Sequence, residues 1–387
     1  MKVTVLKKKI LMILSYILVA AAASVWTLLL NAPEKPEYSK LAQLEELIQD
    51  KYIDEVHTEA IEDAAAAAMV ENLGDRWSYY IPAREYAAYV EKMENAYVGI
   101  GITIILAEDG TGVEVVAVDE NGSADLAGME VGDVIVAVDG TRIAGMDTST
   151  IRDMVRGAEG TRVEITVRRA GEELLLPMTR AYVQTPVATA QLLEDGIGLV
   201  TIKNFDTRCT EETLEAIESL LDQGAEKLIF DVRNNPGGYA SELVKVLDYL
   251  LPQGDLFRTV NYAGKEAVDR SDAECLDIPM AVLVNADSYS AAEFFAAALS
   301  EYEAAIVVGE QTSGKGYFQS TFQLDDGSAV GLSIGKYFTP KGVSLEGVGI
   351  TPDVEVAVDD ETYLSIYYGN LEPEADPQLQ AAILALK

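Results

Sequence analysis

The strongest constraint on the fold of this chain is an alternation of apolar runs with helix-favouring segments that begins at Gly196. The expected order is a strand at 197–202, a helix at 211–221, a strand at 228–232 and a helix at 241–251. A helix between two strands returns the chain to the same end of a sheet, so that the strands pair in parallel. We therefore expect an α/β domain whose mostly parallel sheet is covered by helices.

The next strand, turn and helix of this series carry the candidate chemistry. An apolar run at 281–284 leads through a polar turn to an Ala-rich segment, so Ser290 is predicted to lie at a helix N-terminus. Free N–H groups and the helix dipole favour developing negative charge there. Lys315 follows among glycines, and the single histidine, His57, is far away in sequence. A lysine would therefore have to serve as the base for a nucleophilic serine.

Other interpretations of these two residues stay open at this point. The serine alone would commonly be a helix N-cap, and the lysine alone a solvated loop charge. Gly309, Gly314 and Lys315 also fit most of a phosphate-binding loop. However, Gly316 stands where that loop needs a hydroxyl, and residues 317–322 favour a strand where a helix should begin. Nucleotide binding is therefore disfavoured.

The paired motifs resemble the carboxyl-terminal processing (tail-specific) serine proteases, which cleave peptide bonds with a Ser–Lys dyad. The family's Ser-x-Ser-x-x-Glu and Gly-Lys-Gly-x-x-Gln segments are matched by Ser288, Ser290 and Glu293, and by Gly314, Lys315, Gly316 and Gln319. Tyr289 and Ala292 stand where the family often has Ala and Ser. The similarity extends over residues 75–356.

The resemblance implies a role for each catalytic residue. Ser290 would be the nucleophile, Lys315 its general base, and Gln319 a hydrogen-bonding partner that orients the lysine. The lysine must be neutral to accept a proton, and burial among glycines and aromatic residues would lower its pKa. For Glu293 the sequence supports only a helix-dipole or structural role.

The segment 231–238 follows a predicted strand and ends in Pro236-Gly237-Gly238. Open α/β sheets place their sites at the carboxyl ends of strands. The backbone N–H groups of Gly237 or Gly238, together with that of Ala291, are candidates for an oxyanion hole. Taken alone, the same residues could form a turn and nothing more.

Residues 97–182 differ in character, because short apolar stretches alternate with Gly-Asp and Asp-Gly turns. This segment resembles a PDZ domain. The loop formed by Tyr97, Gly99, Ile100, Gly101 and Ile102 is predicted to bind peptide, with glycine N–H groups turned toward a terminal carboxylate and isoleucines toward the last side chain. A small β domain without a ligand is the alternative.

The N-terminus predicts a membrane anchor. Four lysines lie within residues 1–9, and residues 10–30 carry no charge, which is long enough for one spanning helix. Because the apolar run continues past Ser24, an uncleaved anchor is favoured over a cleaved signal peptide. Lysines remain on the cytoplasmic side, so the rest of the chain should be extracytoplasmic.

Composition limits the partners. The net charge of −35 argues against nucleic acid, which requires clustered Lys and Arg. Cys209 and Cys275 form no C-x-x-C pair, and two free cysteines are favoured over a disulfide. The motifs imply no metal or cofactor. An exposed helical face ahead of the PDZ domain would permit a homodimer.

We therefore expect a multidomain α+β and α/β protein. Its predicted parts are a cytoplasmic tail and anchor at 1–31, a helical region at 32–94, a PDZ domain at 95–182, a crotonase-like peptidase core at 183–358, and an acidic tail with a helix at 359–387. The expected function is that of a membrane-anchored serine endopeptidase whose PDZ domain recognises the C-terminal tails of unfolded or exposed protein substrates. An inactive PDZ adaptor and a crotonase-like acyl-transfer enzyme are the alternatives.

Overall fold

The computed structural model describes residues 39–107 and 109–387. The described residues divide into two units, with the boundary between Ala65 and Ala66. Within the described ranges, no helix combines the length and the apolar character needed to cross a membrane. The predicted anchor at residues 1–31 lies outside the described residues.

The described part of the first unit is helical, as the sequence predicts. It contains α2 (Ser39–Lys51) and the start of α3 (Thr58–Glu71). Leu41, Leu44 and Leu47 of α2 are exposed, so this apolar side of the helix does not belong to a core. The predicted homodimer stays a prediction.

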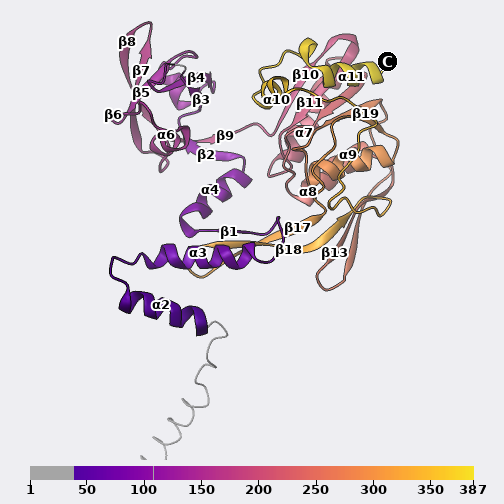
Figure 1. Cartoon of the computed structure of the whole chain (residues 1–387). Helices are drawn as coiled ribbons and strands as arrows, with labels where there is room; N and C mark the ends of the chain where they lie inside the picture. The colour runs from indigo at the N-terminus through magenta and orange to yellow at the C-terminus, as the bar shows by residue number, and fades with distance from the viewer. Residues whose placement is uncertain (1–38, 108) are drawn as a thin grey trace, which may run out of the picture. The chain divides into compact units, whose positions relative to one another are not determined.

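The PDZ region of the second unit is an antiparallel β domain (Figure 1). The strands of its main sheet, in spatial order, are β3 (Ile102–Leu106), β4 (Val113–Val118), β5 (Val134–Val138), β7 (Arg162–Arg169) and β8 (Glu172–Thr179), and β6 (Thr141–Arg142) pairs with β5. Their inward side chains form one buried cluster with Ile151 and Val155 of α6 (Thr148–Val155). β2 (Ala96–Gly99) and β9 (Ala181–Gln184) pair separately, where the chain enters and leaves this domain.

The predicted parallel sheet is present. Its spatial order is β10 (Ala188–Leu192), β11 (Ile197–Ile202), β12 (Lys227–Asp231), β15 (Met280–Val284), β16 (Ala305–Gly309) and β19 (Val354–Glu355). All neighbours from β11 onward are parallel, whereas β10 pairs antiparallel with β11. The sequence missed β10, because an edge strand with exposed residues lacks the continuous apolar run of the inner strands.

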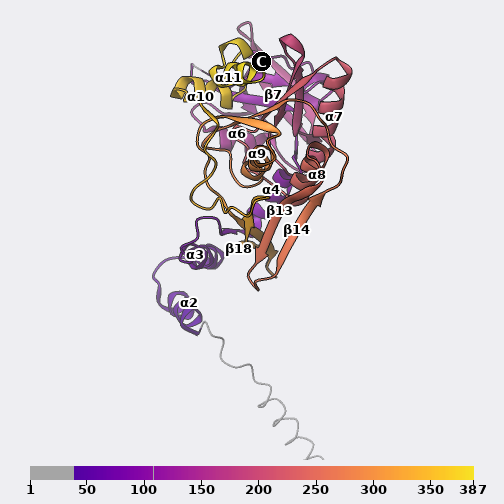
Figure 2. The ribbon, with the colours of Figure 1, turned by 90° about the vertical axis from the view of Figure 1, so that its right-hand side faces the viewer.

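Side chains of this sheet alternate between two faces, with the period of two that strands impose. Val200, Phe230 and Val282 pack in one cluster with α7 (Cys209–Asp222), α8 (Ala240–Leu250) and α9 (Ala291–Glu301). Leu199, Ile229 and Leu283 pack on the other side with Leu379 and Ala382 of α11 (Pro377–Ala385). The helix predicted in the acidic tail is therefore part of the core of this domain. Figure 2 shows α7, α8, α9 and α11 within it.

A buried arginine connects the C-terminal segment to the sheet. Arg233 follows β12 and donates to Asp231 Oδ2 at 2.6 Å and to Asp376 Oδ2 at 2.7 Å. Burial disfavours its charge, but the two carboxylates outweigh burial and raise the pKa of Arg233. Asp376 also caps α11 by accepting from Gln378 N and Leu379 N.

A second, antiparallel sheet was not predicted as such. Its spatial order is β1 (Tyr79–Ile81), β18 (Ala329–Phe338), β13 (Gly254–Asn261) and β14 (Glu266–Ser271), with β17 (Tyr317–Gln323) also paired to β18. Only the strand at β17 was expected from the sequence. β1 precedes the PDZ domain yet pairs with β18, and local sequence patterns carry no signal for such distant pairing. β13 and β14 form the long hairpin in Figure 2.

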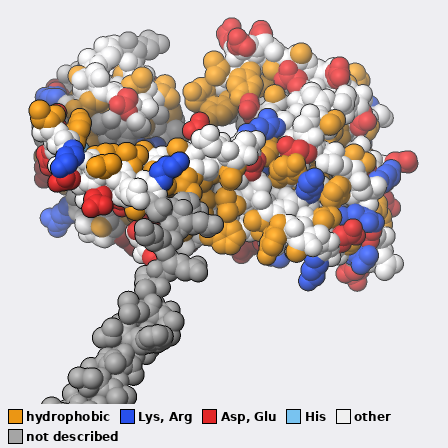
Figure 3. Space-filling model, turned by 60° about the horizontal axis from the view of Figure 1, so that its bottom comes forward, with side chains coloured by type: hydrophobic (Ala, Val, Ile, Leu, Met, Phe, Trp, Pro, Cys, Tyr) orange, Lys and Arg blue, Asp and Glu red, His pale blue; other side chains and the backbone are white. Residues whose placement is uncertain are grey.

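Positive and negative side chains are mixed on one face of the molecule. On the face shown in Figure 3, Lys and Arg side chains are scattered among Asp and Glu, without a continuous basic area on that face. This distribution agrees with the acidic composition of the chain. The visible face therefore lacks the clustered Lys and Arg side chains that bind nucleic acid.

Candidate active site

One cleft of about 900 Å³ brings together the predicted catalytic residues. It is lined by Ser290, Lys315 and Gln319, and also by Gly237 and Gly238. Further lining comes from α4 (Ala83–Met93) and from four residues of the PDZ region, Asn95, Ala96, Tyr97 and Arg156. The residues singled out in separate motifs thus share one solvent-accessible site.

Ser290 adopts a strained backbone conformation immediately before α9. Its φ of 59° and ψ of −125° lie where residues with a side chain are rarely found, at a cost of roughly 1–3 kcal/mol. The residue sits on a sharp turn between β15 and α9, the kind of turn that presents a nucleophile at the top of an α/β sheet. Ser290 is also the N-cap of α9 and forms a capping box with Glu293, but an ordinary N-cap has extended backbone geometry instead of this strained conformation.

Glu293 holds the strained turn and the lysine loop together. Its buried carboxylate accepts from Ser290 N at 2.9 Å, Lys315 N at 2.8 Å, Gly314 N at 2.7 Å and Thr312 Oγ1 at 2.6 Å. Burial raises the pKa of Glu293, and these hydrogen bonds oppose the rise. The sequence supported only a helix-dipole or structural role. The structure makes Glu293 the residue that fixes the backbones of Ser290 and Lys315 relative to each other.

The Lys315 side chain lies beside aromatic rings. Its Nζ is 5.0 Å from the ring centroid of Trp77 and 5.7 Å from that of Tyr289. Burial lowers the pKa of Lys315, whereas Asp75, Glu293 and Glu346 act in the opposite direction. The net direction is the one that a general base requires.

No hydrogen bond links Ser290 Oγ, Lys315 Nζ and the Gln319 amide to one another in the described part of the chain. Gln319 Nε2 donates instead to Ser333 Oγ at 2.9 Å and to Tyr317 O at 3.2 Å. The expected contact between Gln319 and Lys315 is therefore not formed here. Catalytic hydrogen bonds are often long without substrate and shorten in the complex.

Gly237 packs directly against the turn that carries Ser290. A Cβ on Gly237 would stand 2.7 Å from Ser290 Cβ and 2.8 Å from Ala291 N, so no larger residue fits. The Gly237 N–H donates to Asn235 Oδ1 at 2.8 Å and is already engaged. Of the three predicted oxyanion donors, this leaves Gly238 and Ala291. Ala291 is the first residue of α9, so its N–H has no acceptor within the helix.

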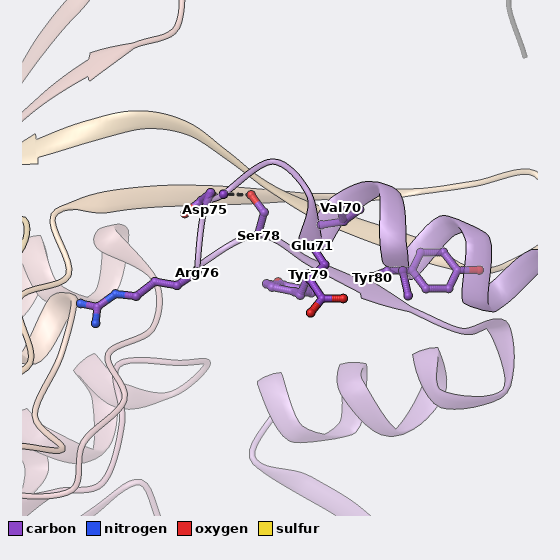
Figure 4. Close-up of a pocket in the computed structure, with 9 residues that line it drawn as sticks. Val70, Glu71, Asp75, Arg76, Ser78, Tyr79 and Tyr80 are labelled. Atoms are coloured by element: carbon purple, nitrogen blue, oxygen red, sulfur yellow. Dashed lines mark hydrogen bonds between the residues drawn. The ribbon is translucent and has the colours of Figure 1, made fainter.

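The segment from Gly74 to Tyr80 contributes residues that sequence reasoning did not place in the site. Arg76 Nη2 donates to Ser313 O at 3.2 Å and to Gly314 O at 3.3 Å, next to the lysine. In Figure 4 the Arg76 side chain extends away from Tyr79 and Tyr80. Trp77 stacks on Tyr289 with ring centroids 6.1 Å apart. The signal available in the sequence was the group of three aromatic residues, Trp77, Tyr79 and Tyr80, within this short segment.

The same segment also supports Gln319. Ser78 Oγ donates to Asp75 Oδ2 at 2.6 Å, the bond drawn in Figure 4, and accepts from Ser333 N at 3.0 Å. Ser333 Oγ in turn accepts from Gln319. Desolvation raises the pKa of Asp75, but hydrogen bonds outweigh it, so the net pKa is lowered and Asp75 stays ionised. A chain of hydrogen bonds thus connects the turn at 75–78 to the cleft.

Comparison with known proteins decides the family. The model of peptidase family S41 matches residues 196–356, and a PDZ domain model matches residues 114–169. A "Probable CtpA-like serine protease" of Staphylococcus saprophyticus is 30% identical over 345 residues, which cover 88% of this chain and 69% of the relative. This chain belongs to peptidase family S41. It is accordingly a serine-type peptidase of the carboxyl-terminal processing family.

Two solved structures are also similar to this S41 peptidase. The photosystem II D1 C-terminal processing protease is 29% identical, with a TM-score of 0.49, over 89% of this chain and 93% of that one. A crystal structure from Bacteroides fragilis, described as an S41 protease, is 17% identical, with a TM-score of 0.53, over 87% of this chain and 91% of that one. The structure from Bacteroides fragilis shares the fold of this chain.

The PDZ domain of this S41 peptidase carries a groove of about 400 Å³ at its predicted peptide loop. Tyr97, Gly99, Ile100, Gly101 and Ile102 all line it, opposite residues of α6. β3 is an edge strand of its sheet. An edge strand beside a helix and a glycine-containing loop is the arrangement that accepts an added peptide strand.

The remaining predictions concern cysteines and metals. Cys209 is buried and Cys275 is exposed, and both are free, as favoured from the sequence. Among residues 39–107 and 109–387, no group of His, Cys, Asp or Glu is arranged to hold a metal ion.

Proposed function

We propose that this protein is a membrane-anchored serine endopeptidase that captures protein substrates by their C-terminal tails and cleaves them with a Ser290–Lys315 dyad. The observation that carries the dyad is the pairing of a strained Ser290 with a partly buried Lys315 on one cleft. Glu293 accepts hydrogen bonds from the backbone of both residues. The bond from Ser290 N belongs to a capping box at the start of α9, but a solvated loop lysine would need no bond from its backbone to the same carboxylate.

In the proposed reaction, Ser290 Oγ attacks the scissile carbonyl carbon while its proton moves to neutral Lys315 Nζ. The carbonyl oxygen becomes an oxyanion that accepts hydrogen bonds from the Gly238 and Ala291 N–H groups. Lys315 then returns the proton to the leaving amine, and the C–N bond breaks to give an acyl-serine. Lys315 next takes a proton from water, whose oxygen attacks the ester and releases the acid. Ser290 regains its proton from Lys315.

The anchor and the location belong to this proposal. Residues 10–30 are uncharged and follow a lysine-rich start, a pattern that supports one spanning helix with the remainder outside the cytoplasm. Protease added to cells with permeable walls should then degrade the catalytic part. Protection until the membrane is lysed would contradict this orientation.

The dyad is tested with Ser290→Ala and Lys315→Ala on an unfolded protein substrate. Both variants should lose cleavage while keeping the thermal unfolding temperature of the parent. Ser219→Ala, on the exposed side of α7, is the matched control and should cleave normally. Retained cleavage by either catalytic variant would refute the dyad. An intact parent that binds C-terminal peptides but cleaves nothing would favour the adaptor alternative. Membership in a peptidase family disfavours the acyl-transfer alternative.

A further inference from the structure

Asp206 is a nearly buried carboxyl in the catalytic cleft for which the mechanism above has no use. It lies between β11 and α7, is 4% exposed and lines the same cleft as Ser290. Its backbone is fully engaged, since its N–H donates to Asn204 Oδ1 at 3.0 Å and its carbonyl accepts from Cys209 N at 3.1 Å. Its carboxylate oxygens, in contrast, make no hydrogen bond or ion pair with any described residue.

Asp206 is next to the proposed oxyanion donor. A Cβ on Gly238 would stand 2.7 Å from Asp206 N and 2.3 Å from the carbonyl carbon of Phe205. Gly238 also forms a parallel bridge with Phe205. Because the two backbones touch, a substrate chain that places its carbonyl at Gly238 also brings neighbouring side chains close to Asp206.

Among residues 39–107 and 109–387, no charged side chain pairs with this carboxyl. Lys92 of α4 is the cation within electrostatic range, and no ion pair joins it to Asp206 in the described structure. The other ionisable groups in range are Tyr239, Tyr289 and Cys209, whose pKa values burial raises, so they are neutral near pH 7. Burial of a carboxylate is costly unless a partner compensates it. Because Asp206 lines the cleft, a bound substrate could supply the missing partner.

We propose that Asp206 forms a substrate subsite next to the oxyanion donor that accepts a lysine or arginine side chain of the polypeptide. A carboxylate offers only acceptor oxygens, and an ammonium or guanidinium group offers both donors and the opposite charge. Acidic side chains would be repelled from the same position. This proposal rests on the proposed peptidase function.

The preference should depend on pH in one direction. Burial raises the pKa of Asp206 to about 7, and Lys92 opposes the rise. A substrate lysine stays charged through neutral pH, so the attraction requires an ionised Asp206. The preference for lysine should therefore be full above about pH 8 and should fade as the pH drops through 7.

The experiment uses the full-length protein in detergent and peptide pairs that differ only by lysine against norleucine, placed at successive positions around the cleavage site. Cleavage is measured as kcat/KM with the active enzyme, and binding is measured as Kd with the Ser290→Ala variant. At one position, lysine should be favoured about tenfold or more in both readouts at pH 8. Asp206→Asn should abolish that preference and still cleave the norleucine peptide.

Glu94→Gln is the matched control. Glu94 is exposed at the end of α4 and within electrostatic range of Tyr239, so this variant removes one negative charge near the cleft without touching Asp206. It should keep the lysine preference. A preference that survives in Asp206→Asn, or is equally lost in Glu94→Gln, would overturn the proposal. So would lysine and norleucine peptides of equal affinity at every position.

Two further measurements, peptide affinity and its pH dependence, test the Asp206 subsite if the enzyme is inactive or a variant does not fold. If the parent enzyme cleaves no peptide, the proposed function fails, and the Kd values of the Ser290→Ala variant still decide whether Asp206 selects lysine. If Asp206→Asn does not fold, the pH dependence of the preference in the parent decides instead. A preference unchanged between pH 5.5 and 8 would refute the assignment.

Discussion

The PDZ groove and the catalytic cleft of this molecule are assembled in different ways. The groove is lined mainly by two stretches of chain, β2 to β3 and α6, and the groups that would hold a peptide are backbone groups and apolar side chains. The cleft draws on segments from Tyr79 to Tyr337 and depends on side chains whose charge is set by burial. The groove is thus built mainly from local stretches of chain, whereas the cleft is built by the tertiary structure.

The largest expected effect is a loss of activity in the cleft without any change in the PDZ groove. Lys315→Arg keeps a positive charge but cannot supply a neutral base, so kcat should fall by roughly 10²–10⁴-fold, the usual contribution of a general base. The affinity of the PDZ groove for a C-terminal peptide should not change. Peptide Kd and kcat measured on the same preparation test this. A parallel loss of peptide binding would show that the groove and the cleft are not independent.

The next effect concerns the residue that assembles the cleft. Glu293→Gln removes the charge and one acceptor oxygen from a carboxylate that serves four donors. Each unsatisfied buried donor costs about 1–3 kcal/mol, so the unfolding temperature should fall and kcat should drop by about a hundredfold. Glu218→Gln, on the exposed side of α7, is the control and should change neither. A normal kcat in Glu293→Gln would show that Glu293 does not position Ser290 and Lys315.

A smaller effect is expected from the groove. Amidation of a peptide's C-terminus removes the carboxylate that the glycine-containing loop is predicted to recognise. At low substrate concentration, kcat/KM should fall about tenfold, because charge-assisted hydrogen bonds of about 1.5–3 kcal/mol are lost. Deletion of the PDZ domain should abolish the difference between free and amidated peptides. Equal rates for the two peptides in the parent enzyme would show that the domain does not read tails.

The smallest expected effect is a shift in the pH dependence of kcat/KM, which reports the pKa of Lys315. A base works when neutral, so kcat/KM should rise with pH through the lowered pKa of Lys315 and level off above it. The Trp77 ring favours the charged lysine by about 0.5–1 kcal/mol. Trp77→Leu should therefore shift this rise to lower pH by about half a unit. Trp77→Phe keeps an aromatic face and should shift it less. A shift toward higher pH in Trp77→Leu would contradict the proposed contact.

Several elements were predictable from local patterns. The strand at 197–202 coincides with β11, and α7, α8 and β12 differ from their predicted bounds by one or two residues. Apolar runs and helical periodicity determine such elements within a few residues of chain. The paired motifs also placed Ser290 and Lys315 on one cleft, since both follow neighbouring parallel strands, β15 and β16.

The sequence by itself thus determined the family, the parallel sheet and the candidate dyad. Only the tertiary structure decided which atoms surround Glu293, Trp77 and Asp206. The role of each depends on hydrogen bonds, ring contacts and burial created by distant segments. Arg76, for example, reaches a carbonyl 237 positions further along the chain. Local periodicity encodes which face of an element is buried, but the identity of the atoms that meet there is fixed only when the layers pack.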